Sequence, residues 1–418
     1  MVLTNNKGKL LAEYKPEVKA HLETLRGLVW PNGSVSASVD GDYRAHWIRD
    51  GLYVMKAFEY LGLYSDVYRM IKVPIKIFHR FQEKIHSGIG EKPHVNYKFL
   101  HARYDPNNYN ELEEQWGHNQ LDMLGQFLYE IGDLIKKTKL PILDSNACRD
   151  DKYLINKITR YLETLEWWDC PDFGIWEEGP EHHASSIGAV LAGLERIRDL
   201  HDNELFFNHK QLAYGRKMLD RILPAESKSD LKEPDKNRQV DMAQLSLIWP
   251  YMIVTPKQEQ SILLNIETLL VRKQGLARYP KDAYWNGSDQ RIRIKRLPSG
   301  LKMACYEAGS EGFPNKNKGT EAQWPLGFAW LSICYSKIAK RKFENKEDYK
   351  HEKEKARFYL EKMRTQVVDI DGAKYFPELF VNDIPNINTP LAWPTAFFIV
   401  AARSYMEIEN RFILYKTA

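Results

Sequence analysis

The sequence has 418 residues, of which 43% are hydrophobic and 28% are charged, a mixture typical of a folded globular protein. This composition excludes a disordered, collagen-like or coiled-coil chain. Lys and Arg outnumber Asp and Glu by 60 to 56, and a formal net charge of +4 is too small to indicate nucleic acid or an anionic membrane as a partner.

The cysteines and the apolar segments favour a cytoplasmic protein. The 4 cysteines lie far apart, with no C-x-x-C pair and no disulfide-framework spacing, so we expect reduced thiols. The N-terminal residues MVLTNNKGKLLAEYKPEV include charges before the apolar region of a signal peptide can form. The longest apolar stretch, 391–402, is too short to cross a bilayer and contains Pro394, so we expect no membrane anchor.

Helical spacing of apolar residues, at i, i+3, i+4 and i+7, dominates the chain. It occurs in windows at about 10–28, 47–61, 64–85, 119–137, 150–167, 184–200, 208–222, 240–254, 256–272, 324–340, 346–366 and 391–408. No proline-rich or serine-rich linker and no short repeat divides these windows, so we expect a single domain over residues 1–418.

Long connections precede every second helical window. They cover residues 29–46, 86–118, 168–183, 223–239, 273–323 and 367–390. This alternation predicts an all-α double ring, a toroid of helix hairpins in which inner and outer helices alternate and the long loops share one end. Because loops on a rigid scaffold usually carry function, we expect a cleft there, lined by helix N-termini.

The first two long loops end in polar residues beside tryptophan. The motif HWIRDG contains Trp47, Arg49 and Asp50. An Asp at a helix start is often a cap, but adjacent Arg and Asp in a cleft can also hydrogen-bond several sugar hydroxyls. The motif EEQWGHNQLD places Trp116 beside amides and a carboxylate, and an indole can stack on a pyranose. Capping with a surface aromatic is the alternative.

The third long loop carries two adjacent glutamates. In DFGIWEEGPEHHASS, Trp176 precedes Glu177 and Glu178, and a carboxyl beside an indole can have its pKa raised by desolvation. An ordinary exposed glutamate pair is the alternative. His182 and His183 follow, but two adjacent histidines without a third ligand do not predict a metal site.

Motifs for cofactors are missing from the sequence. The segment GIGEKP lacks the third glycine of a dinucleotide-binding turn, and neither a P-loop nor an HExxH motif occurs. We therefore expect no cofactor and no metal.

The later loops repeat the combination of charged groups and aromatic rings. Between 273 and 324 it is formed by Arg278, Tyr279, Asp282, Trp285, Glu321 and Trp324. Before the last window, KYFPELFVNDIPN supplies Glu378, which alone would be interpreted as a loop carboxylate in water. A carbohydrate site is indicated by the convergence of all these loops and not by any one of them.

Five motifs in order, HWIRDG, EQWGHNQLD, GIWEEG, RYPKDAY and PLAW, resemble glycoside hydrolase family 15, the glucoamylase family. The resemblance covers nearly the whole chain and implies an (α/α)6 barrel. It also implies that Glu177 is the general acid and that Glu178 helps to hold the sugar on the leaving-group side. Glu378 lies where the family places its catalytic base, although its PEL context differs from the flanks in secreted glucoamylases.

The same resemblance assigns sugar-binding residues. Arg49 and Asp50 match the pair that binds the terminal glucose, and Trp116, Arg278 and Asp282 match other residues of the family's substrate site. Three indoles of the same loops complete the expected substrate-binding set: Trp47, Trp176 and Trp324.

The implied activity is exo-acting hydrolysis of α-glucosidic chains with release of β-glucose from the non-reducing end. An inverting reaction uses two carboxyls about 6.5–9.5 Å apart, here Glu177 protonated beside Trp176 and Glu378 ionised in contact with water. No starch-binding module is visible, so we expect short soluble oligosaccharides as substrates. The linkage, α-1,4, α-1,6 or that of trehalose, and the oligomeric state stay open.

The sequence allows two other interpretations. WEEGPEHHASSIGAVLAGLE, RYPKDAY, EAQWPLGFAWL and FPEL are also similar to the glucoamylase-like domain of phosphorylase kinase alpha and beta subunits, which implies a non-catalytic, carbohydrate-sensing or regulatory domain. An unsaturated-uronide hydrolase would need a basic cluster facing an acidic sugar, and Arg49 and Arg278 are too few for that.

Overall fold

The computed structural model describes residues 5–39, 41–112, 116–138, 140–146, 149–228, 238–284, 290–296, 302–308 and 319–416. Within these residues, the inner helices are α2 (Ile48–Tyr60), α5 (Leu121–Lys137), α7 (Ala184–Arg198), α9 (Leu245–Ile248), α11 (Leu326–Glu344) and α13 (Ala392–Lys416). Each packs against the next in this order, and α13 packs against α2, so that the ring closes.

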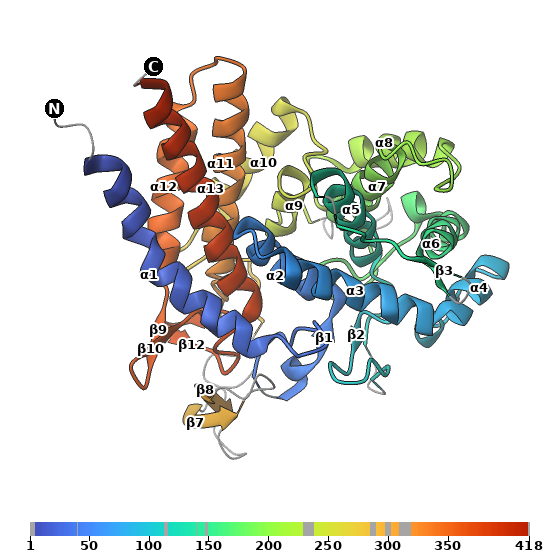
Figure 1. The fold of residues 1–418 in the computed structure, drawn as a ribbon, viewed down its shortest axis with the longest axis horizontal. Coiled ribbons are helices and arrows are strands. Elements are labelled where there is room, and N and C mark those ends of the chain that lie inside the picture. The colour runs from blue at the N-terminus through green and yellow to red at the C-terminus, as the bar shows by residue number, and fades with distance from the viewer. Residues whose placement is uncertain are drawn as a thin grey trace.

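Outer helices cover this ring. They are α1 (Asn5–Leu28), α3 (Tyr64–Arg80), α6 (Asp151–Leu165), α8 (Lys210–Ile222), α10 (Pro256–Leu269) and α12 (Lys350–Arg364). The first of them, α1, packs against the last inner helix, α13, and the two helices lie side by side in Figure 1. A further helix, α4 (Gln82–Gly90), follows α3 and packs against α6.

Burial along the helices explains which ring each one joins. The outer helix α12 buries Ala356, Tyr359, Leu360 and Met363, a stripe at i, i+3, i+4 and i+7. The inner helix α5 is buried on every side from 121 to 134. A helix with one apolar stripe covers a core, whereas one that is buried all round belongs inside it.

Two glycines let the inner helices α5 and α7 approach closely. A Cβ on Gly125 would lie 2.3 Å from the backbone nitrogen of Val190, and a Cβ on Gly193 would lie 2.4 Å from the carbonyl oxygen of Gly125. Such distances are far below a van der Waals contact, so a side chain at either position would push the helices apart.

The middle of the ring is filled with aromatic side chains. Tyr53 stacks on Trp393, with ring centroids 5.0 Å apart, and contacts Trp330 and Phe397 edge-on. The indole N–H of Trp330 donates to the carbonyl oxygen of Trp249 at 2.9 Å. One of these packed rings, Trp393, also lines the cavity that the long loops form.

Short antiparallel strand pairs tie the loops together. They are β1 (His46–Trp47) with β2 (Arg103–Tyr104), β3 (Ser145–Asn146) with β4 (Arg149–Asp150), β5 (His182–His183) with β6 (Ser227–Lys228), β9 (Val368–Ile370) with β10 (Ala373–Tyr375), and β11 (Phe380–Val381) with β12 (Ile384–Pro385). Short 3-10 turns occur at η1 (Gly41–Arg44), η2 (Asn96–Lys98), η3 (Trp167–Asp169) and η5 (Met242–Gln244).

The helical windows expected from the sequence coincide with these helices, with two differences. The window 64–85 divides into α3 and α4 at Phe81. The window 240–254 forms only η5 and the short α9, because Pro250 cannot continue a helix and the preceding residue, Trp249, is extended.

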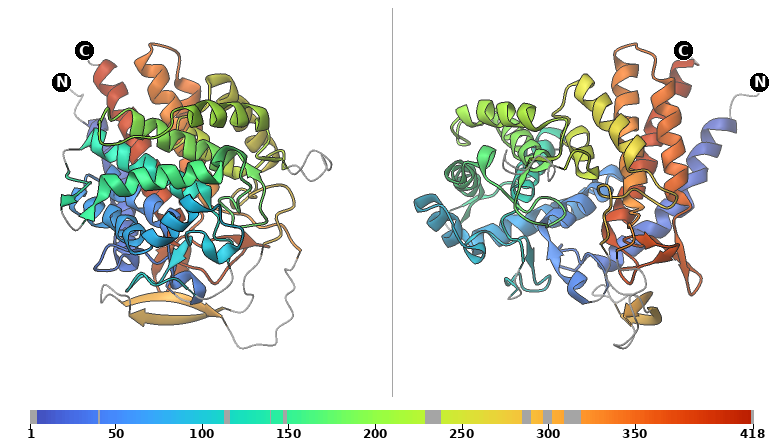
Figure 2. Two further views of the ribbon diagram at one scale, coloured as in Figure 1. Left: turned by 90° about the vertical axis from the view of Figure 1, so that its right-hand side faces the viewer. Right: turned by 180° about the vertical axis from the view of Figure 1, so that it is seen from behind.

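One hairpin was not expected from the sequence. Within the connection 273–323, β7 (Gln290–Arg296) pairs with β8 (Lys302–Ala308) and projects from the body of the protein (Figure 2). Its strand QRIRIKR does alternate apolar and polar residues, the period of a strand. Among the described residues, no helix has the length and apolarity needed to cross a membrane.

Candidate active site

A cavity of about 240 Å³ lies where the long loops meet the first turns of the inner helices. Its walls come from the loops before α2, α5, α7, α11 and α13. All but one of the site residues expected from the sequence line it: Trp47, Arg49, Asp50, Trp116, Trp176, Glu177, Glu178, Arg278, Trp324 and Glu378. The other lining residues are Ala37, Tyr43, Ile175, Tyr284, Leu326, Leu391 and Trp393.

Glu177 is held by three donors from two other loops. Its Oε1 accepts from Arg49 at 2.8 Å and from the amide of Gln120 at 3.1 Å, and its Oε2 accepts from the indole N–H of Trp116 at 2.7 Å. The backbone of Glu177 is left-handed, with φ 61°, a conformation that costs about 1–3 kcal/mol for residues other than glycine. Contacts from neighbouring loops thus fix this carboxyl in a strained turn.

Arg49 joins Glu177 to the start of α5. It lies in the first turn of α2 with 4% of its surface exposed, and one amino group of its guanidinium donates to Gln120 at 2.8 Å and to Asp122 at 3.2 Å. The other amino group donates to Glu177. A buried guanidinium shared between carboxylates is rigid, because each partner fixes part of its planar fork.

The pKa of Asp50 depends on the charges of Glu177 and Glu378. Burial raises its pKa to about 7, the positive charge of Arg49 opposes this rise, and the negative charges of Glu177 and Glu378 add to it. The nitrogen Nε of Arg49 lies 3.9 Å from its carboxylate. Because Asp50 interacts with both glutamates, all three carboxyls share one electrostatic environment.

Glu378 lies in the loop before α13 and accepts hydrogen bonds from neutral donors. Its Oε1 accepts from the hydroxyl of Tyr43 at 2.7 Å, and its Oε2 accepts from the side-chain amides of Asn388, at 2.8 Å, and Asn386. Only 3% of its surface is exposed. Burial raises the pKa of Glu378, while these hydrogen bonds and the charge of Arg278 act against the rise.

Asp282 supports the site from behind the cavity wall. Its two oxygens accept from the Nε and an amino group of Arg278 at 2.7 and 2.8 Å, and from the indole N–H of Trp324 at 2.9 Å. It is completely buried and does not line the cavity. Its bonds orient Arg278 and Trp324, two residues of the cavity wall, and Asp282 stays a predicted residue of the substrate site.

Glu178 is also tied into the protein. Its Oε1 accepts from the hydroxyl of Tyr279 at 2.7 Å and lies 3.0 Å from Arg278, and its Oε2 accepts from Arg238. Arg238 comes from the loop before α9 and also donates to Asp241 at 3.2 Å. That loop, in its described part, stands behind the cavity wall and fixes the lining residues.

The comparisons with known proteins identify the family. The sequence profile described as "Glycosyl hydrolases family 15" matches residues 28–356. The chain belongs to this family. The motifs had indicated this family, whose members are described as glycosyl hydrolases. The matched range ends before Glu378.

One curated relative of this family 15 chain is distant in sequence. An uncharacterized glycosyl hydrolase of Methanocaldococcus jannaschii is 23% identical over 405 residues, which make up 91% of this chain and 54% of that protein. This chain therefore spans about half the length of that curated relative.

Two solved structures share the fold. A wild-type glycosidase superposes with a TM-score of 0.70 at 17% identity, covering 95% of this chain and 98% of its own. A glucoamylase from Saccharomycopsis fibuligera superposes with a TM-score of 0.64 at 15% identity, covering 98% and 99%. The (α/α)6 barrel expected from the sequence is confirmed.

The environments of the two glutamates differ from the expectation. Trp176 was expected to shield Glu177, but its indole N–H donates to Asp241 at 2.7 Å, and Glu177 faces Arg49 instead. Glu378 was expected in contact with water, yet it is the more buried of the two. The reason is the hairpin after Glu378, which folds back over its carboxylate and shields it.

Several residues of the site were not found from the sequence. Tyr284 ends the quoted motif RYPKDAY and Asn386 ends the quoted segment KYFPELFVNDIPN, but neither was singled out, and Tyr43 and Asn388 lie in no quoted segment. Contacts between loops decide their positions: the hydroxyls of Tyr43 and Tyr284, for example, lie 3.0 Å apart. Trp393 was within the quoted motif PLAW but was not singled out. Trp285 lies outside the described residues.

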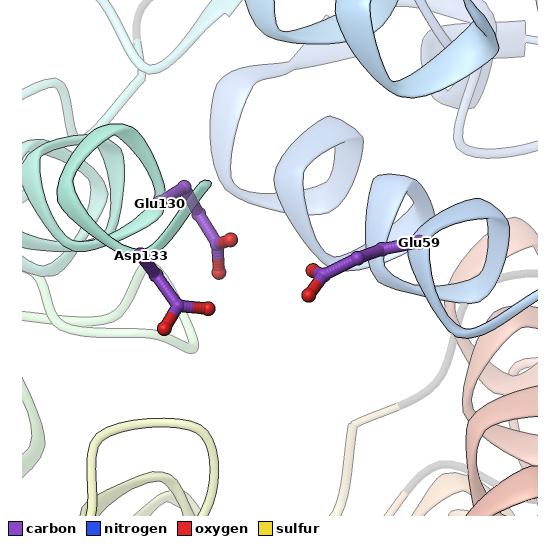
Figure 3. Close-up of side chains that lie close together, drawn as sticks. All are labelled: Glu59, Glu130 and Asp133. Atoms are coloured by element: carbon purple, nitrogen blue, oxygen red, sulfur yellow. The ribbon is translucent and has the colours of Figure 1, made fainter. Parts of the chain in front are cut away.

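A carboxylate cluster outside the cavity resembles a metal site. Glu59 of α2 and Glu130 and Asp133 of α5 point toward one another (Figure 3). The ammonium of Lys56, however, lies 2.8, 2.6 and 3.3 Å from their oxygens. A lysine thus holds the position that a cation would take, and the cluster is an ion-paired contact between two inner helices.

The adjacent histidines do not form a ligand set with it. His182 lies 3.2 Å from a carboxylate oxygen of Asp169, and His183 is buried with its pKa lowered to about 3, chiefly by burial. Both residues belong to β5, where they pair with β6.

Proposed function

We propose that this protein is an inverting, exo-acting α-glucosidase of the glucoamylase type, which releases glucose from the non-reducing end of short α-glucans. The proposal includes the whole chain as one catalytic unit and a cytoplasmic location. The observation that carries it is that Glu177 and Glu378, far apart in the sequence, line one cavity together with Arg49, Asp50 and Arg278.

In the proposed reaction, Glu177 gives its proton to the glycosidic oxygen as the bond from that oxygen to the anomeric carbon breaks. A water molecule attacks the anomeric carbon from the other face and gives a proton to Glu378. The product sugar is then the opposite anomer of the substrate, which is the meaning of inversion. This arrangement requires the two carboxyls to be about 6.5–9.5 Å apart.

The hydrogen bonds of each glutamate support a division of roles between its oxygens. Oε1 of Glu177 accepts two donors, whereas Oε2 accepts the indole N–H of Trp116, so we assign the transferable proton to Oε2. Oε2 of Glu378 accepts two amide donors, so we assign the water to Oε1, beside the hydroxyl of Tyr43.

The lining of the cavity supports a terminal sugar as ligand. Its volume of about 240 Å³ is below the roughly 300–1,000 Å³ of pockets for drug-sized ligands. Charged groups from Arg49, Asp50 and Arg278 can bind hydroxyls, and indole rings can face the apolar side of a pyranose. We propose Trp47, Trp116, Trp176 and Trp324 for that contact, with Glu178 on the leaving-group side.

Product analysis tests this function. The purified protein is incubated with maltose, isomaltose, trehalose and maltotriose, and the glucose anomers are followed by proton NMR. We expect β-glucose to appear first, because inversion of an α-linkage gives the β-anomer. With maltotriose, whose leaving group is maltose, release of glucose first as the α-anomer would contradict inversion. No cleavage of any of the four sugars would contradict the hydrolase and favour the carbohydrate-sensing alternative.

A further inference from the structure

The hairpin that follows Glu378 brings its own residues back onto that carboxylate. Strand β11 pairs with β12 in the register Phe380 with Pro385 and Val381 with Ile384. The two residues between the strands, Asn382 and Asp383, have φ values of 51° and 64°, as in the two-residue turn that suits a hairpin. This local turn decides which residues stand opposite Glu378.

Two asparagines meet Glu378 through this register. The backbone N–H of Asn386 donates to the carbonyl oxygen of Leu379 at 3.1 Å, and the N–H of Glu378 donates to the carbonyl oxygen of Asn388 at 3.2 Å. The side-chain amides of both asparagines then donate to Oε2 of Glu378. Asn386 is completely buried and Asn388 is 6% exposed, so these bonds lie away from water.

We propose that Asn386 and Asn388 are positioning residues for the base, which hold Glu378 in one rotamer and keep it ionised so that it can accept a proton from water. This inference rests on the proposed function. The inference extends that function, because it assigns control of the proposed base, Glu378, to the hairpin that follows Glu378 in the sequence.

Burial and hydrogen bonding have opposite effects on the charged form of Glu378. Burial disfavours the charged form of a carboxyl, whereas each N–H donor favours it. Two amides on one oxygen are strong donors to a charge, and they cannot titrate, so their effect is the same at every pH. Among the described residues, the other titratable or charged groups that influence Glu378 include Tyr43, Tyr284, Asp50 and Arg278.

The test replaces an amide by an apolar group of the same shape. In Asn388→Leu or Asn386→Leu, we expect the acid limb of the pH profile of kcat to move to higher pH by about one unit, because a hydrogen bond to a charge is lost. Activity below the limb then falls about tenfold, while activity at the plateau changes much less. Asn388→Ser keeps a donor and should lie between the wild type and Asn388→Leu.

A matched control separates positioning from packing. Gln211 is a completely buried amide on the outer helix α8 whose side chain accepts from the indole N–H of Trp167 at 2.9 Å. Gln211→Met should lower the melting temperature without moving the acid limb. An acid limb of Asn388→Leu that coincides with that of the wild type, or a fall in kcat that is equal at every pH, would overturn the proposal.

A second readout does not depend on activity. Without its amide donors the carboxyl of Glu378 is protonated more readily in the folded state, so ionisation penalises the folded variant more as the pH rises. The melting temperature of Asn388→Leu should therefore fall further below that of the wild type at pH 7 than at pH 4. A constant difference contradicts the inference. If the wild type cleaves no sugar, the proposed function fails. The melting temperatures still test whether the amide of Asn388 favours the ionised form of Glu378.

Discussion

At the level of single residues, Glu177 and Glu378 are held in the cavity by different hydrogen-bond donors. Glu177 accepts from a guanidinium, an indole and an amide, whereas Glu378 accepts from a phenol and two amides. The presence of Glu177 in the cavity was predictable from the motif GIWEEG. Its partners were only partly predictable: Trp116 and Gln120 lie in one motif, but the choice of Trp116 as donor depends on where two loops meet.

The first prediction concerns the pair itself. Glu177→Gln and Glu378→Gln should each lower kcat by at least about 10²–10⁴-fold, the usual contribution of a general acid or base. Glutamine keeps the shape of glutamate, so the melting temperature should change little. Steady-state kinetics on the best of the four sugars, with thermal melting of each variant, measures both effects.

A loop carboxylate outside the cavity provides the control. Glu321 accepts from Arg272 at 2.6 Å and does not line the cavity, so Glu321→Gln should keep nearly full turnover. If Glu177→Gln or Glu378→Gln retains most of the activity, that residue does not have its assigned role.

The second prediction follows from the raised pKa of Asp50, which is about 7 in the folded protein against an ordinary value of 3.8. A carboxyl with a raised pKa stabilises the fold at low pH, and that stability is lost as the pH rises from about 4 through 7. Asp50→Asn removes this effect. Relative to the variant, the wild type should lose at most about 4 kcal/mol between pH 4 and pH 8, since one pKa unit is about 1.4 kcal/mol.

Denaturant unfolding of both proteins without sugar, at several pH values, measures this difference. Parallel curves of the free energy of unfolding against pH for the wild type and Asp50→Asn would show that the carboxyl of Asp50 is not shifted.

At the level of elements, close contact between inner helices sets the width of the ring. Gly125→Ala should therefore destabilise the protein by about 1–3 kcal/mol or more, because the added methyl group meets the backbone of α7. Gly90→Ala is the control, since nothing lies within 4 Å of a Cβ at that position. Equal unfolding free energies for the two variants would contradict the tight contact between α5 and α7.

The lysine-centred cluster joins the inner helices α2 and α5. Lys56→Met should cost about 3–5 kcal/mol of stability, because it leaves Glu59, Glu130 and Asp133 buried without their central positive charge. Burial already raises the pKa of Glu130 to about 8, even with Lys56 opposing the rise. Chemical denaturation of Lys56→Met measures the loss.

Metal addition tests whether a divalent cation can replace Lys56 among the three carboxylates. Mg²⁺, Ca²⁺ or EDTA should leave the melting temperature of the wild type unchanged, because the ammonium of Lys56 stands where a cation would bind. A clear rise with a divalent cation would show that Lys56 gives way to a metal.

At the level of the whole molecule, the alternation of long and short connections predicted the double ring, because each long loop must return to the same end. The contacts across the cavity were less predictable. Arg49 reaches Glu177, and Tyr43 reaches Glu378, across 128 and 335 residues of sequence. No local pattern encodes such pairs. The hairpin before Asn386 differs, since its Asn-Asp turn is a local signal, and the contacts that it sets up with Glu378 span only 8 and 10 residues of sequence.

Closure of the ring by α13 against α2 has a consequence for synthesis on the ribosome. A growing polypeptide that has emerged through α11 already contains Glu177 and its three donors, but neither Glu378 nor the helix that completes the circle. Such a nascent chain cannot bind and cleave a sugar in the proposed way. Catalytic competence would then appear abruptly, only after the α13 segment has left the exit tunnel and docked on a helix made more than 300 residues earlier.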